Sequence, residues 1–174
     1  MPDLTVNHLR REHQEAQSAL QRLGALLNEL EQDPAWTPER CKVFETIRDF
    51  LTHGLLQLFQ KEEEVLFPAL QGLFPQPEGP LQVLRGEHET LKSRFGEVCR
   101  AGRSLRKGEN PEQNLRAFCQ AGRSGAEALG DHFYKEDRVL FPMVARYLTP
   151  ERDAELALRM EGITHNNTAS IEGS

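Results

Sequence analysis

Two segments of this chain are near copies of each other, and both carry polar residues of metal-ligand type. Residues 132–142 read HFYKEDRVLFP, and residues 58–68 read LFQKEEEVLFP. Phe, Lys, Glu, Val, Leu, Phe and Pro coincide in the two copies, but Leu58 stands where the later copy has His132. The chain therefore contains a repeat in which one copy has lost a histidine.

Further histidines precede the two segments at matching places. His13 and His88 each follow a glutamate, and the spacing from each to its partner segment agrees to within one residue. His132 and Glu136 are four residues apart, so they share one face of a helix, and Glu62 is the counterpart of Glu136. Imidazole and carboxylate groups repeated in this way predict a metal site at a pseudo-twofold axis, with one ligand missing.

The elements that must position these residues begin at clear helix-start signals. Residues 37–39 and 149–151 read Thr-Pro-Glu, and residues 110–112 read Asn-Pro-Glu. Each offers an N-cap oxygen, a proline at the first helical position and an acid in the first turn. Apolar residues recur at intervals of three and four, and strand signals are absent. We expect an all-α protein, an up-down-up-down four-helix bundle with helices at roughly 4–31, 38–70, 80–107 and 111–148 and a short fifth helix near 150–161.

In domain terms, we expect residues 1–148 to form the bundle and residues 149–174 to form the short C-terminal helix and a tail. The glycine- and proline-containing stretch 72–79 divides the two copies. Pro68 and Pro142 occupy the same point of the repeat, and each should kink or end its helix because proline lacks a backbone N–H.

Composition excludes several classes of function. The net charge of −6 argues against nucleic acid as a partner, since phosphates require a basic face. No apolar run is long enough to cross a bilayer, and the N-terminus lacks the features of a signal peptide. The three cysteines (Cys41, Cys99 and Cys119) are odd in number and share no close spacing, which argues against a disulfide framework or a thiolate zinc site. We therefore predict a cytoplasmic protein with no membrane partner.

The bundle topology predicts how the ligands meet. Helices one and three run parallel to each other, and helices two and four run antiparallel to them. The equal spacings then bring His13 level with position 58, and His88 level with His132, while Glu62 and Glu136 face each other between the two pairs. Bundle cores hold paired iron or manganese ions with such sets of imidazoles and carboxylates.

This pattern resembles the hemerythrin-like (HHE cation-binding) family over roughly residues 4–148. The resemblance rests on the five candidate ligands and on the Leu-Phe-Pro that follows each carboxylate in the repeat. It implies a four-helix bundle around a non-haem di-iron centre with Glu62 and Glu136 as bridging carboxylates. Members of the family carry or sense oxygen, sense iron, or handle nitric oxide, peroxide and iron–sulfur damage. The metal ligands implied in this chain are His13, Glu62, His88, His132 and Glu136.

The chain departs from the family pattern at Leu58, where a histidine is expected. Leucine cannot bind a metal, so we predict two unequal iron sites. The site of the second copy should be well held, and the site of the first copy should be weak, vacant or more open to small ligands. Glu63 is one candidate for a replacement ligand, whereas His8 and His53 are expected at the surface. Two phenylalanines, Phe59 and Phe133, should wall the site.

Three functions remain open from the sequence. The first is an iron-binding protein that meets a small diatomic ligand (O2 or NO) or peroxide as a sensor, scavenger or carrier, with or without turnover. The second is a bundle that has lost its metal and acts through protein contacts. The third is a mononuclear zinc or manganese site with a structural role. A sensor would need a protein partner or a homodimer for its output, because the chain carries no second domain.

Overall fold

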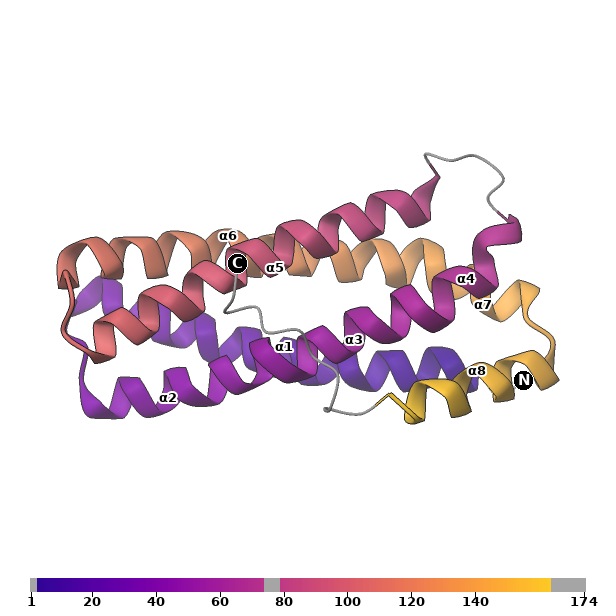
Figure 1. Ribbon diagram of the computed structural model, residues 1–174, viewed down its shortest axis with the longest axis horizontal. Helices are drawn as coiled ribbons and strands as arrows, with labels where there is room; N and C mark the ends of the chain where they lie inside the picture. Colours follow the sequence, from indigo (N-terminus) through magenta and orange to yellow (C-terminus); the bar gives the residue numbers. More distant parts are fainter. Residues whose placement is uncertain (1–2, 74–78, 164–174) are drawn as a thin grey trace.

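A computed structural model of the protein describes residues 3–73 and 79–163. Four long helical segments form an elongated bundle, and a short helix packs at one end (Figure 1). The second and fourth segments are continuous helices that pass through π-helical turns. The elements are α1 (Leu4–Gln32), α2 (Pro38–Asp49), a π-helical turn (Phe50–Gly54), α3 (Leu55–Lys61), a π-helical turn (Glu62–Leu66), α4 (Phe67–Leu70), a 3-10 turn (Gln71–Leu73), α5 (Pro80–Arg106), α6 (Pro111–Lys135), a π-helical turn (Glu136–Leu140), α7 (Phe141–Tyr147) and α8 (Pro150–Glu161).

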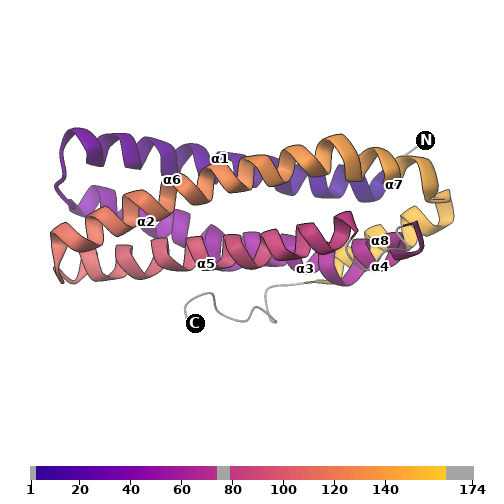
Figure 2. The ribbon, with the colours of Figure 1, turned by 90° about the horizontal axis from the view of Figure 1, so that it is seen from above.

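The direction of the segments confirms the expected topology. α1 and α5 run one way along the bundle, while α2–α4 and α6–α7 run the other way (Figures 1 and 2). The described residues contain no β-strand. None of the helices in residues 3–73 and 79–163 is long and apolar enough to cross a membrane.

Two of the three predicted helix caps are present. The hydroxyl of Thr37 accepts a hydrogen bond from the backbone N–H of Arg40, and Thr149 accepts one from Arg152, each at 3.3 Å. Asn110 does not cap with its side chain, because its backbone adopts a left-handed conformation with φ of 40°. The expected side-chain cap at Asn110 is therefore wrong, although α6 begins at the following proline as predicted.

Phenylalanine rings from the second, third and fourth helical segments fill the interior of the bundle. The fully buried phenylalanines are Phe44, Phe59, Phe67, Phe95, Phe118 and Phe141. Burial of one such side chain contributes roughly 1.5–3 kcal/mol. Small residues leave room for them: a Cβ added at Gly102 would lie 2.3 Å from the Phe44 ring. This packing fixes the distances between helices, and so the positions of the polar residues inside the bundle.

The short helix α8 closes the N-terminal end of α1 through one buried carboxylate. Asp153 accepts hydrogen bonds from the backbone N–H groups of Leu4 at 2.8 Å and Thr5 at 2.9 Å. It thus caps α1 from a distant part of the chain and lies at the positive end of the α1 dipole. We expect Asp153→Ala to lower the free energy of unfolding by about 2 kcal/mol, because two backbone donors, one of them buried, lose their acceptor. Chemical denaturation would measure this loss, with the exposed Asp131→Ala as the matched control; equal stability of the two variants would contradict it.

Candidate metal centre

Five polar side chains converge in the core of the bundle. They occupy both copies of each repeated ligand position, except that the first copy has Leu58 where the second has His132. His13 comes from α1, His88 from α5 and His132 from α6, and Glu62 and Glu136 begin the π-helical turns that follow α3 and α6. His13 is 3% exposed, and the other four are fully buried. The structure therefore brings together all five candidate ligands that the sequence predicts.

Four of the five side chains are close enough together to hold a metal ion. One ligand atom from each of Glu62, His88, His132 and Glu136 lies within 4.8 Å of the others. The Nε2 atom of His88 lies 3.2 Å from Glu62 Oε2, and that of His132 lies 3.4 Å from Glu136 Oε1. His13 Nε2 lies 3.2 Å from Glu136 Oε2 and 3.7 Å from Glu62 Oε1. The two carboxylates thus lie between His13 on one side and His88 with His132 on the other.

Hydrogen bonds to glutamates that are not candidate ligands fix the orientation of two imidazoles. His88 Nδ1 donates to Glu63 Oε1 at 2.6 Å, and His132 Nδ1 donates to Glu87 Oε2 at 2.9 Å. With the ring proton on Nδ1, each neutral ring directs an Nε2 lone pair into the core. The two Nε2 atoms are 3.0 Å apart. Two lone pairs at this separation repel each other unless a cation or a proton lies between them.

The carboxylates show the same need for a cation. All four oxygens of Glu62 and Glu136 are buried without a hydrogen-bond partner. Burial of unpaired carboxylates costs several kcal/mol, whereas a bound cation removes that cost. Nitrogen and oxygen ligands in this ratio suit ferrous or ferric iron, and also zinc or manganese. Glu62 together with His88, His132 and Glu136 of the second copy therefore fits a metal ion.

Comparison with known proteins also indicates a cation-binding domain. The family model described as the hemerythrin HHE cation binding domain matches residues 4–144. The chain belongs to this family. Among curated proteins it is similar to the iron-sulfur cluster repair protein YtfE of Yersinia pestis (strain Pestoides F) and of Yersinia pseudotuberculosis serotype O:1b (strain IP 31758). Each is 29% identical over 93 residues, which is 53% of this chain and 42% of the relative. The chain thus spans less than half the length of these relatives.

Charges in this hemerythrin-family centre shift the proton affinity of its members. Burial alone would lower the pKa of His13, but hydrogen bonds and charge from Glu136 and Glu62 raise the pKa to about 9. Glu62 and Glu63 raise the pKa of His88 to about 9 in the same way. Burial and the neighbouring Glu62 charge raise the pKa of Glu136. In the metal-free protein, protons therefore take the place of the cation among these groups.

These shifts predict opposite pH dependences for metal-free and metal-loaded protein. His13 and His88 have folded pKa values raised to about 9 from 6.5, so their stabilisation is complete below pH 6.5 and is lost as the pH rises to 9. A metal requires unprotonated imidazoles, so its stabilisation grows over the same range. We expect the melting temperature of chelator-treated protein to fall between pH 6.5 and 9 relative to that of iron-loaded protein. Calorimetry with and without iron tests this, and parallel curves would contradict it.

Glu62 and Glu136 both stand at the start of a π-helical turn. The backbone N–H of Phe67 donates to the carbonyl of Glu62, and that of Phe141 donates to the carbonyl of Glu136. The next residue in each case is the repeated proline, which has no N–H to donate and would crowd an α-helical turn. The helix widens by one residue here and continues past each proline, so Pro68 and Pro142 do not end their helices at this point. Such turns are frequent at functional sites because they redirect side chains.

Aromatic rings cover the imidazoles symmetrically. Phe59 stacks on His88 and Phe133 stacks on His13, each with ring centroids 4.0 Å apart. Both rings belong to the repeated segments, and both are buried. The predicted walls of the site are therefore present, and they exclude water from it.

Two expectations about residues near Leu58 are wrong. Glu63 does not turn toward Leu58; its carboxylate accepts the hydrogen bond from His88 on the other side of the centre. His8 is not a surface residue, because its side chain is 12% exposed and contacts Lys61 and Glu12. His53 lies at the surface, as expected. A helical wheel gives the direction of each side chain but not the neighbour that it meets.

Sequence analysis also missed the acceptors outside the candidate ligands. Glu87 contacts both His132 and Lys135, and the corresponding Glu12 contacts Lys61. The repeat could have indicated these contacts. A glutamate immediately precedes both His13 and His88, and a lysine immediately precedes both Glu62 and Glu136. Each Glu-His pair therefore supplies one candidate ligand, the histidine, and one glutamate that contacts polar groups outside the ligand cluster.

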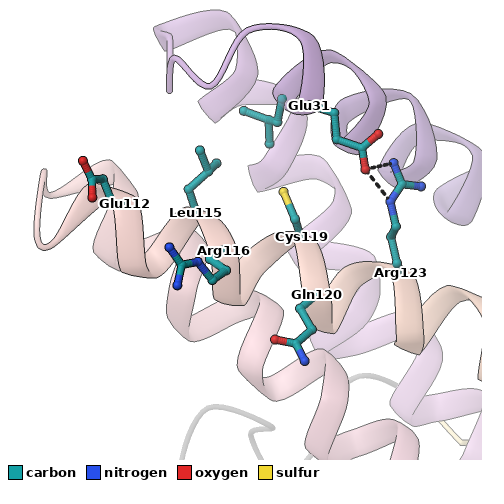
Figure 3. A pocket seen from close by; sticks show the side chains of 8 residues that line it. Glu31, Glu112, Leu115, Arg116, Cys119, Gln120 and Arg123 are labelled. Carbon is teal, nitrogen blue, oxygen red and sulfur yellow. Dashed lines mark hydrogen bonds and ion pairs between the residues drawn. The ribbon is translucent and has the colours of Figure 1, made fainter.

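A separate surface pocket lies between the end of α1 and the first half of α6 (Figure 3). It has a volume of about 520 Å³ and contains Cys119 and an ion pair between Arg123 and Glu31. Burial and then the Glu31 charge raise the pKa of the Cys119 thiol. A thiol that stays protonated is a poor nucleophile and a poor metal ligand. We therefore do not regard this pocket as a functional site.

Proposed function

We propose that this protein holds non-haem iron in the bundle core and brings it into contact with a small ligand, O2, NO or peroxide. The main iron site is formed by Glu62, His88, His132 and Glu136, and His13 lies on the far side of the two carboxylates. The observation that carries the proposal is the approach of the His88 and His132 Nε2 atoms to 3.0 Å beside four unpartnered carboxylate oxygens. Membership of a cation-binding family supports it.

Iron in this environment would supply reversible binding of a small ligand or slow electron transfer to it. Two imidazoles and two carboxylates leave room in the coordination shell of iron for such a ligand. The protein's own residues prepare the site: Glu63 and Glu87 hold the imidazoles in the ligating orientation, and Phe59 and Phe133 exclude water. Leu58 is 1% exposed and gives the first-copy side an apolar wall.

The role that we propose is that of a sensor, scavenger or carrier in the cell interior. The similarity to proteins named for iron-sulfur cluster repair supports a role in stress from small oxidants or nitric oxide, where such clusters are damaged. A partner protein or a second copy of the chain would relay the signal of a sensor.

Anaerobic addition of ferrous iron to the metal-free protein tests the proposal. We expect binding of iron, followed by a change in the near-ultraviolet and visible absorption on exposure to O2, NO or peroxide. Zinc or manganese in preference to iron would favour a structural metal site. Absence of binding by any of the three metals would favour the protein-interaction function.

A further inference from the structure

The two copies of the repeat differ outside the candidate ligands as well as at position 58. In the second copy, both histidines donate Nδ1–H to a glutamate, His88 to Glu63 and His132 to Glu87. These acceptors leave both Nε2 lone pairs for a metal. Loss of such an outer hydrogen bond typically weakens metal binding by about 10- to 100-fold.

His13 has no such acceptor. Both of its ring nitrogens are buried without a hydrogen-bond partner, and no carboxylate contact is made by Nδ1. The residue that corresponds to Glu63 in the other copy is Asp137, whose side chain is shorter by one methylene. Asp137 is 41% exposed, and its carboxylate lies 4.0 Å from Arg10 instead of contacting His13. Nothing in the described part of the chain therefore fixes the His13 ring proton on Nδ1.

The Nε2 atom of His13, in contrast, faces carboxylate oxygens. It lies 3.2 Å from Glu136 Oε2 and 3.7 Å from Glu62 Oε1. With a carboxylate near Nε2 and none near Nδ1, a neutral imidazole favours the proton on Nε2, from which a small rotation would complete a hydrogen bond to Glu136 Oε2. This is the reverse of the tautomer on His88 and His132. The absence of an Nδ1 acceptor thus favours His13 as a hydrogen-bond donor over His13 as a metal ligand.

A buried positive charge also lies in the first copy. Lys61 is 7% exposed and contacts Glu12 and His8, whereas the corresponding Lys135 is 50% exposed. Glu12 corresponds to Glu87, but with Leu58 in place of a histidine its Oε2 atom is buried without a partner. The Lys61 ammonium group lies one helical turn from position 58 and pairs with Glu12, the residue that would otherwise face a histidine there.

From these contacts we propose that the centre holds one iron, in the second copy, and that His13 acts as a positioning residue. It donates a hydrogen bond from Nε2 to Glu136 and so holds this carboxylate toward the single metal. The inference rests on the proposed iron function and departs from the two-iron centre that the family resemblance implies. The first copy has lost a ligand at Leu58 and an outer acceptor at Asp137.

Iron stoichiometry and the spectrum of the NO adduct test this inference in the full-length protein. We compare wild type with His13→Leu, which removes the donor, His13→Gln, which retains an N–H donor, and His88→Leu as the matched loss of a proposed ligand. After anaerobic loading with ferrous iron, we expect one iron per chain in wild type and in both His13 variants. We expect His88→Leu to bind iron at least about tenfold more weakly.

The spectrum separates a positioning role from a purely structural one. The electron paramagnetic resonance spectrum of the NO adduct should change in His13→Leu and return toward wild type in His13→Gln. Circular dichroism establishes that each variant is folded. Two irons in wild type, or loss of iron in His13→Leu as large as in His88→Leu, would overturn the inference while leaving the iron function intact. Absence of iron from wild type would overturn the proposed function itself.

Discussion

His132→Leu should abolish tight iron binding, because it gives the second copy of the repeat the residue that the first copy carries at Leu58. The substitution removes one ligand of the main site and leaves the Glu87 carboxylate without its imidazole donor. Loss of an outer partner alone costs about 10- to 100-fold in metal affinity, so loss of the ligand should cost at least about 100-fold. Titration of the metal-free protein with ferrous iron measures the affinity.

The matched control is His53→Leu, which removes a surface histidine from the helical segment that also contains Leu58. It should bind iron with the affinity of wild type. Iron binding in His132→Leu that equals binding in the control would contradict the placement of the main site in the second copy.

Leu58→His should move the iron stoichiometry from one toward two per chain. The introduced imidazole would find an outer acceptor already in place, since Glu12 Oε2 is buried without a partner. The second iron should still bind weakly, because His13 lacks an acceptor for its Nδ1–H. Adding Asp137→Glu supplies the longer carboxylate that Glu63 provides in the other copy, and should tighten the second site by about tenfold or more. Elemental analysis after dialysis at graded iron concentrations measures both steps.

Gln57→His controls for the mere addition of a histidine, because position 57 points about 100° away from position 58 on the helix. We expect no second iron in this variant. A second iron in Gln57→His, or none in Leu58→His with Asp137→Glu, would contradict the assignment of position 58 as the place of the missing ligand.

Much of the fold follows from local sequence signals. Thr37 and Thr149 cap helices as their Thr-Pro-Glu sequences predict, and the helix bounds agree with the sequence to within a few residues. Asn110 shows the limit of such signals, because the tight turn into α6 requires a left-handed residue there and removes the side-chain cap. The repeat itself predicts the convergence of the five candidate ligands, since equal spacings in an up-down-up-down bundle place them at one level.

The orientation of polar side chains around these ligands could not be predicted in the same way. Glu63 and Asp137 occupy equivalent positions, yet the difference of one methylene decides which one reaches an imidazole. His8 is drawn inward by Lys61, a contact between α1 and α3 that no periodicity in either helix reveals. The repeated prolines predict a disturbance of the helix, but whether the helix ends, kinks or widens depends on tertiary packing.

Metal identity and stoichiometry per chain test the central claim most directly. Protein purified without chelator from iron-replete cells, and protein loaded anaerobically with ferrous iron, would be analysed for iron, zinc and manganese. We predict that the bound metal is iron, at about one per chain. Glu62 and the second-copy residues His88, His132 and Glu136 should hold it. Absence of iron from both samples, with or without another metal in its place, would contradict the claim.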